Sequence, residues 1–269
     1  MHDTSRETIL TDSSDFRKFA SAAELTTQDR PFFYIAGRSP PPPVWEAAFY
    51  LLLTSLGAII LVVYRAQIGG AFKGLDRSFY KKQFIYTACT GFGFMTVVTV
   101  LIQCIVPLFG APYLAGTVVI TSILLGAGVT SFAMNLRKTG STFMIALLST
   151  GLIVIVLILL PGLTARLSDI IATKTLLGRI MICCLCFFPL GMLMGVPFPA
   201  ILSLARTRGS SHVVLAYAGD VSFSILGIVV SLILPILVGY SVMFYTAAVG
   251  YAVITLILIS IKSTDVSTI

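Results

Sequence analysis

Long stretches without any Asp, Glu, Lys or Arg alternate with short polar segments along this chain. The uncharged stretches cover residues 84–136, 139–165, 180–205 and 221–261. About 20 consecutive apolar residues are enough to cross the hydrocarbon core of a bilayer as one helix. The pattern therefore predicts an all-α, polytopic bundle of membrane helices.

Turn-forming residues divide these stretches into about seven expected spans. Gly110-Ala111-Pro112 separates the second span from the third, and Gly239-Tyr240 separates the last two, because glycine permits tight turns and proline disfavours a helical predecessor. The expected spans are residues 44–64, 84–109, 113–134, 142–160, 176–202, 213–238 and 241–261. We thus expect a transmembrane domain over residues 44–262. It follows a polar tail, residues 1–43, that ends in four prolines and favours an extended spacer.

The positions of prolines and charged residues predict two departures from a simple series of straight spans, one after the fourth span and one within the fifth. Pro161-Gly162 is expected to end the fourth span, and residues 163–177, where charged residues alternate with apolar ones, are expected to form a connector on the membrane surface. The fifth span holds Pro189, Pro197 and Pro199, each of which removes a backbone donor. We therefore expect that span to be kinked or broken.

Composition and charge placement narrow the function classes. Charged residues make up 11% of the chain and hydrophobic residues 57%, whereas soluble domains carry roughly 25% charged residues. The net charge of +7 comes from Lys and Arg in short loops, where they determine topology. We expect contact with membrane lipids and no nucleic-acid binding. The loops after the first, third and fifth spans are the more basic, which predicts an N-terminal tail outside the cytoplasm.

Cysteine and histidine offer little chemistry. All five cysteines lie inside apolar runs and are expected to be buried thiols, including the cluster Cys183-Cys184-x-Cys186. His2 lies in the tail and His212 in an expected loop, so we expect no embedded histidine to ligate a haem or a chlorophyll. We predict no metal site, no cofactor and no catalytic constellation, and therefore no enzyme.

Two polar residues inside the expected spans are candidates for a site. Asp220 lies within the sixth span, where an ionised carboxylate costs about 2.5–3.5 kcal/mol. It is interpreted either as a proton- or cation-linked site or as a hydrogen-bonded contact between helices. Gln103, in the second span, is interpreted as an interhelical hydrogen-bonding residue. In the fifth span, Gly191-x-x-x-Gly195 fits the small-residue packing motif, and Pro197 and Pro199 follow it.

Several strings together resemble membrane-embedded spermidine-synthase-like proteins. They are Thr27-Gln28-Asp29-Arg30-Pro31-Phe32-Phe33, Gly93-Phe94-Met95 with Leu101-Ile102-Gln103, Gly191 to Pro199, and Ala216 to Gly227. The resemblance runs in order from about residue 23 to residue 261 and implies the membrane region of such a protein without its aminopropyltransferase domain. Positions where that family carries polar groups correspond here to Val98, Cys104 and Ala111, and a sixth-span Asn corresponds to Asp220.

These observations leave three functional hypotheses. The leading one is a non-catalytic membrane subunit that packs against partner membrane proteins. The second is a small transporter or channel component that uses Asp220. The third is the membrane anchor of a separately encoded spermidine-synthase-like enzyme.

Overall fold

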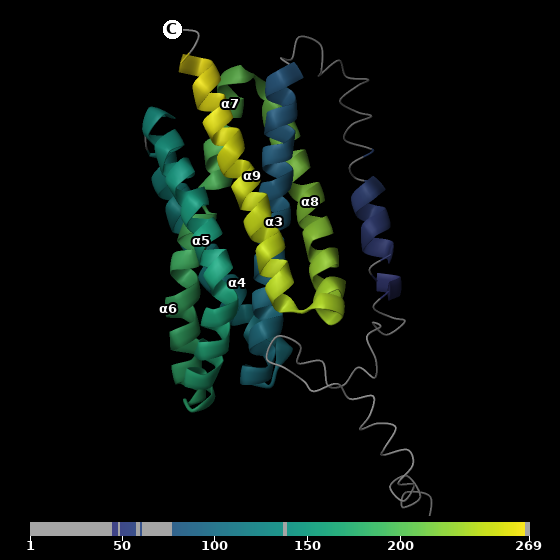
Figure 1. Ribbon diagram of the computed structural model, residues 1–269, viewed down its shortest axis with the longest axis vertical. Coiled ribbons are helices and arrows are strands. Elements are labelled where there is room, and N and C mark those ends of the chain that lie inside the picture. The colour runs from purple at the N-terminus through teal and green to yellow at the C-terminus, as the bar shows by residue number, and fades with distance from the viewer. Residues whose placement is uncertain (1–44, 48, 58–59, 61–76, 137–138, 267–269) are drawn as a thin grey trace, which may run out of the picture.

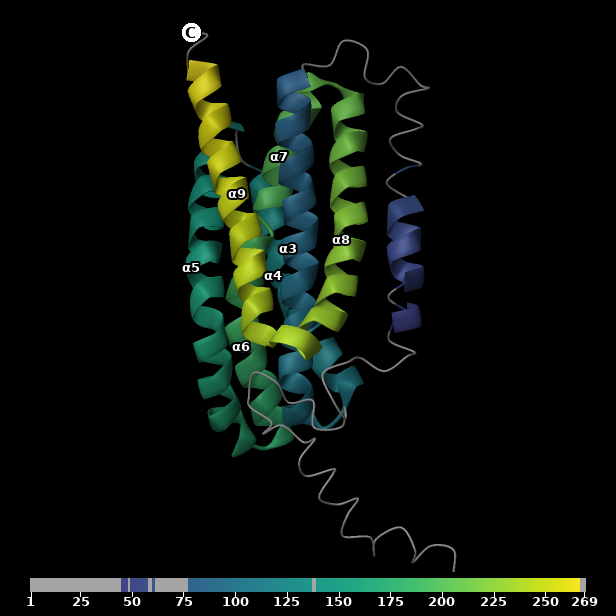
Figure 2. The same cartoon turned by 45° about the vertical axis from the view of Figure 1, so that its right-hand side comes forward.

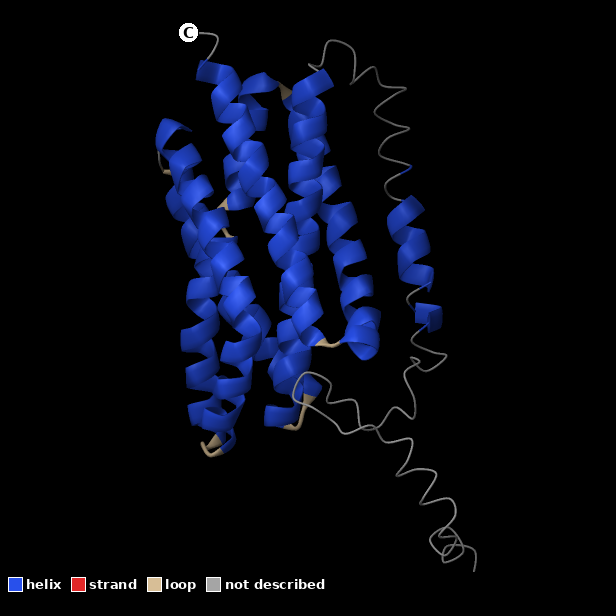
Figure 3. Ribbon diagram, viewed as in Figure 1, coloured by secondary structure: helices blue, strands red, loops and turns tan. Residues whose placement is uncertain are grey.

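All regular structure in the described part of the chain is α-helical (Figures 1 and 3). The computed structural model describes residues 45–47, 49–57, 60, 77–136 and 139–266. Its long helices are α3 (Arg77–Phe109), α4 (Pro112–Asn135), α5 (Thr139–Ala172), α6 (Leu176–Met194), α7 (Pro197–Arg208), α8 (Ser210–Val238) and α9 (Tyr240–Val266). The expected all-α bundle is confirmed.

Six segments of the described residues are long and apolar enough to cross a membrane, with α6 and α7 counted together. This number identifies an integral membrane protein. The expected first span falls on residues 44–64, only some of which are described. Residues 45–47 and 49–57 are helical, and they lie beside α8 on the outside of the bundle (Figure 2).

Glycines with positive φ form three tight turns. The φ angles are 68° at Gly110, 121° at Gly209 and 92° at Gly239, a region that glycine adopts without steric cost. Gly110 and Gly239 lie where the sequence predicts turns. Gly209 lets α8 begin directly after α7, so the expectation of a loop at His212 is wrong: His212 lies in the first turn of α8 and is buried.

The expected end of the fourth span at Pro161 is also wrong. Helix α5 is 34 residues long and continues through Pro161 to Ala172, a total length of about 51 Å at 1.5 Å per residue. Residues 163–172 therefore belong to the same helix as the fourth span and do not form a separate connector on the membrane surface. A proline within a helix removes one donor and kinks the helix without having to end it. Similarly, Arg77, Lys81 and Lys82, expected in a loop, lie in the first turns of α3.

The expected break in the fifth span is present. Helix α6 ends at Met194, Gly195 and Val196 are not helical, and Pro197 begins α7. Pro189 stays inside α6. The break falls where a glycine and a proline are two residues apart, a combination that both frees the backbone and prevents helix continuation.

The helices form two sets of three, here called triplets, and each helix of the second triplet runs antiparallel to the corresponding helix of the first. The first is α3, α4 and α5; the second is α6–α7, α8 and α9 (Figure 1). Helix α3 packs most extensively on α8, α4 packs on α6, and α5 packs on α9. In order along the chain, α3 corresponds to α6–α7, α4 to α8 and α5 to α9. If corresponding helices are exchanged, the α3–α8 contact becomes the α6–α4 contact, and the α5–α9 contact remains the same. These three contacts are thus related in the way that an inverted repeat would relate them.

Candidate functional site

Glycines bring the backbones of two parallel helix pairs into contact. A Cβ atom on Gly91 of α3 would overlap the carbonyl oxygen of Asp220 in α8, and one on Gly191 of α6 would overlap that of Ile123 in α4. A Cβ atom on Gly195 would lie 2.5 Å from the Cα of Ala127. Gly191 and Gly195 thus face α4 at the distance that small residues permit.

Asp220 lies deep in the bundle, about 15 Å along the axis from the first turn of α8 at 1.5 Å per residue. It is partly buried. Its carboxylate forms no hydrogen bond or ion pair with another described residue. Tyr251 of α9 interacts electrostatically with Asp220, and Tyr86 of α3 interacts electrostatically with Tyr251. We refer to these three residues as the tyrosine–aspartate cluster.

Both tyrosines are fully buried. The Tyr86 hydroxyl donates a hydrogen bond of 2.9 Å to the carbonyl oxygen of Pro197. The Tyr251 hydroxyl finds no hydrogen-bond partner within the described chain, although its ring packs against Gly93. A buried hydroxyl without a partner costs about 1–3 kcal/mol, so Tyr251 holds a donor and an acceptor that no described residue uses.

The break between α6 and α7 lies next to this cluster. Tyr86 bonds to Pro197 at the start of α7, and the ring of Phe198 packs edge-to-face on Tyr217 of α8, with centroids 5.2 Å apart. Tyr217 is one turn before Asp220. Pro199, in the same first turn of α7, is partly buried. The start of α7 is thus bound to α3 through Tyr86 and packs on α8 through Tyr217, three residues before Asp220.

Gln103 lies away from Asp220, toward the other end of α3. Its side-chain nitrogen donates to the carbonyl oxygen of Ser231 in α8 at 2.9 Å. The Gln103 Oε1 and Ser231 Oγ atoms are buried and without a partner among the described residues. The structure thus places Gln103 in a bond between helices and does not bring it to the cluster.

A second polar contact between α3 and α8 lies near the first residues of both helices, at the end opposite to Gln103. Gln83 is fully buried, its Nε2 donates to the carbonyl oxygen of His212 at 2.6 Å, and its Oε1 lies 2.8 Å from His212 Nδ1. The rings of Phe79 and His212 are 5.3 Å apart, and the Arg208 guanidinium lies 3.8 Å from the centre of the Phe79 ring. These groups join the starts of α3 and α8 at the basic end of the bundle.

None of the cysteines of the expected spans is in a disulfide: these are Cys89, Cys104, Cys183, Cys184 and Cys186. Cys183 is buried, whereas Cys186 is exposed, so the two do not share an environment. Among the residues that the structure describes, no group of three or more His, Cys, Asp or Glu side chains is placed to hold a metal ion.

Asp220 and the helix break are predictable from the sequence, whereas the two tyrosines were not predicted. Tyr86 and Tyr251 lie inside apolar stretches, whereas membrane tyrosines are enriched at the interfaces. That position is the signal that could have identified them. No protein-family model, curated protein or solved structure matches the chain.

Proposed function

We propose that this integral membrane protein is a transport protein in which Asp220 exchanges a proton or binds a cation. The observation that carries the proposal is Asp220 itself, a carboxyl group within a membrane-spanning helix, α8, that packs on α7 directly after the α6–α7 break. Ionisable residues within membrane helices mark ion and proton paths. Broken helices at the repeat interface are a recurring feature of transporter sites.

The packing supports a functional role for Asp220. The equivalent close contact between α4 and α6 has Ile123 where the α3–α8 contact has Asp220. A carboxylate is therefore not needed to bring two of these helices together.

Flux measurements on purified protein in liposomes test the proposal. An imposed membrane potential should drive proton entry, read with a pH-sensitive dye, or ⁸⁶Rb⁺ uptake, above the rate of empty vesicles. Asp220→Asn keeps the size of the side chain and should abolish the flux. Asp169→Asn, at the exposed end of α5, is the matched control and should keep it. Wild-type vesicles as tight as empty ones, or an active Asp220→Asn variant, would overturn the proposal.

A second candidate is a subunit that packs against partner membrane proteins. It is favoured by the helical residues 45–47 and 49–57, where Trp45, Phe49, Tyr50 and Leu53 are exposed and Ser55 alone is buried. The Ser55 hydroxyl donates to the carbonyl oxygen of Ser222 at 3.0 Å. Photo-crosslinkers at Phe49 and Leu53 in native membranes should then capture one stoichiometric membrane protein. Crosslinks to lipid alone would count against this role.

Identification of the captured protein also tests the relation to spermidine-synthase-like proteins. If this chain anchors a separately encoded aminopropyltransferase, that enzyme should be recovered with it. Recovery of other partners without such an enzyme would remove the anchor hypothesis.

Orientation forms part of the proposal. Lys81, Lys82, Arg206 and Arg208 lie at the end of the bundle where α3 begins and α7 ends. Positive-inside topology places this end in the cytoplasm and the N-terminal tail outside. Single cysteines at Ser210 and Lys174, in a cysteine-free background, should react with an impermeant thiol reagent from opposite sides. Reaction of Ser210→Cys from outside intact cells would reverse the orientation.

A further inference from the structure

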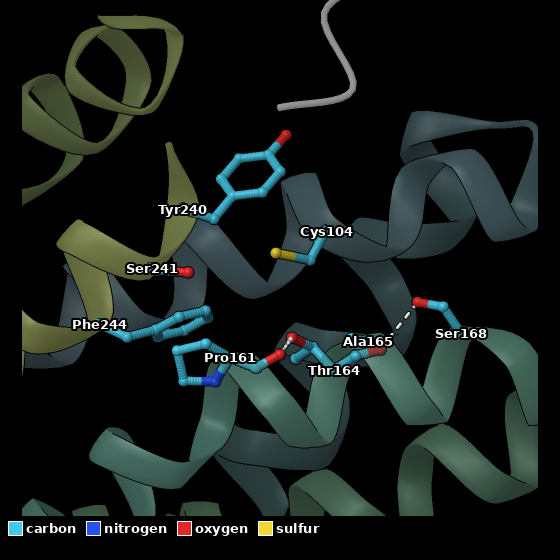
Figure 4. Close-up of a pocket in the computed structure, with 8 residues that line it drawn as sticks. All are labelled: Cys104, Pro161, Thr164, Ala165, Ser168, Tyr240, Ser241 and Phe244. Atoms are coloured by element: carbon cyan, nitrogen blue, oxygen red, sulfur yellow. Dashed lines mark hydrogen bonds between the residues drawn. The ribbon is translucent and has the colours of Figure 1, made fainter. Parts of the chain in front are cut away.

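A pocket of about 140 Å³ lies between α3, α5 and α9, on the side of the bundle where Gly239 turns (Figure 4). Its lining includes Cys104, Pro161, Thr164, Ser168 and Phe244. At roughly 30 Å³ per water molecule in the liquid, it has room for about five waters. A solute of a few non-hydrogen atoms, or a partly hydrated ion, therefore fits.

The hydroxyl groups on the α5 wall present acceptors to the pocket. Thr164 Oγ1 donates its proton to the carbonyl oxygen of Pro161 at 3.0 Å, and Ser168 Oγ donates to that of Thr164 at 2.8 Å. Since each hydroxyl carries one proton and two lone pairs, what remains for a ligand is the lone pairs. Hydroxyl lone pairs of this kind can accept a hydrogen bond from a ligand or coordinate a cation.

Phe244 lines the pocket and is fully buried. Tyr251 lies seven residues further along α9, which is two helical turns on the same face and about 10 Å deeper. Phe244 is therefore the lining residue on α9 that comes closest along the helix to Tyr251, which interacts electrostatically with Asp220.

We propose that this pocket is the entrance site for a small monovalent cation, of the ammonium or alkali-metal type, and that the Phe244 side chain closes the path from it to Asp220. The proposal rests on the transport function and names its substrate class. The pocket selects through neutral oxygen acceptors, and the single carboxylate deeper in the bundle takes up the charge.

Uptake of two probes into proteoliposomes tests the substrate class. ¹⁴C-methylammonium represents the ammonium type and ⁸⁶Rb⁺ the alkali-metal type. The double variant Thr164→Val/Ser168→Ala removes the two acceptors with little change of shape and should raise the KM of the transported probe about tenfold. Thr246→Val removes a hydroxyl of α9 that bonds only its own backbone, to Val242, and should leave the KM unchanged. An unchanged KM in the double variant would overturn the proposal.

Thiol labelling tests the role of Phe244 without a transport readout. With the native cysteines replaced, Ala248→Cys places a thiol at a buried position one turn beyond Phe244. Adding Phe244→Ala should speed its reaction with a small cationic methanethiosulfonate by about tenfold. Equal labelling rates with and without Phe244 would show that this side chain does not close the path.

The two proposals fail in different ways. If Asp220→Asn abolishes flux while the pocket variants change neither KM nor labelling, the transport function stands and the entrance is elsewhere. If wild-type vesicles carry neither probe nor protons, the transport function itself is wrong.

Discussion

The α3–α8 and α4–α6 pairs are packed alike but differ in the polar groups that they contain. In each pair a glycine lies against a backbone carbonyl of the partner helix: Gly91 against Asp220, and Gly191 against Ile123. Ile123 is fully buried and apolar. Because the same backbone approach is reached with isoleucine, close packing does not account for the aspartate. The comparison thus indicates that the fold requires Gly91 and Gly191 for close packing but does not require the side chain of Asp220.

Exchanging the two side chains tests this separation most strongly. Ile123→Asp should lower the free energy of unfolding by about 3 kcal/mol, the cost of a carboxylate in the membrane interior. Asp220→Leu should leave that free energy unchanged or raise it. Denaturation of the bicelle-reconstituted protein by SDS would measure both. A loss of stability in Asp220→Leu as large as that in Ile123→Asp would assign Asp220 to structure.

The glycines should behave alike in the two pairs. Gly91→Ala and Gly191→Ala each place a methyl group against backbone and should destabilise the bundle by about 2 kcal/mol. Gly116→Ala and Gly128→Ala, where an added Cβ meets no atom within 4 Å, are the controls and should not. The same unfolding measurement applies. Tolerance of alanine at Gly91 or Gly191 would mean that the helices can separate at no cost.

The next largest effect on the free energy of unfolding is expected at the Gln83–His212 contact, where α3 and α8 begin. Gln83→Leu removes the two Gln83 hydrogen bonds, to the carbonyl oxygen and to Nδ1 of His212, which should cost about 1–2 kcal/mol for buried groups. Thr117→Val, an exposed hydroxyl on α4 bonded to its own backbone at Tyr113, is the control. Equal midpoints of unfolding for the two variants would show that the Gln83–His212 contact adds no stability.

Single hydrogen bonds between helices should matter least, and equally in both pairs. Gln103→Leu removes the bond to Ser231, and Ser131→Ala removes a bond of 3.1 Å to the Gly195 carbonyl. Such bonds average about 0.6 kcal/mol in a membrane protein. A much larger loss for Gln103→Leu in the unfolding assay would indicate a role beyond this single bond.

Charge-free stretches were sufficient to predict the helical bundle, but proline alone did not locate the helix ends. Pro161 and Pro189 stay within helices, whereas Pro197 starts one. The difference at Pro197 is the glycine two residues earlier. Charged residues did not mark the helix ends either. Arg166 and Asp169 lie in the last turns of α5, because a helix longer than the bilayer is thick can continue beyond it.

The candidate site was predictable only in part. Asp220 could be identified from its cost in a membrane, which is a property of one residue. Its proximity to Tyr251 depends on the pairing of α8 and α9 around α3, which no local pattern encodes. His212 was misplaced for a similar reason, since a single positive φ at Gly209 decides whether a helix or a loop follows.

The side chain of Arg179, at the start of α6, joins three helix ends. It donates to the carbonyl oxygens of Leu108 in α3, Ala172 in α5 and Lys174 just beyond α5. Two walls of the pocket, α3 and α5, are thereby joined about one helical turn beyond Cys104 and Ser168, whereas the third wall, α9, follows the glycine turn at Gly239. We therefore expect a change in the width of the pocket to come from movement of α9 relative to α3 and α5.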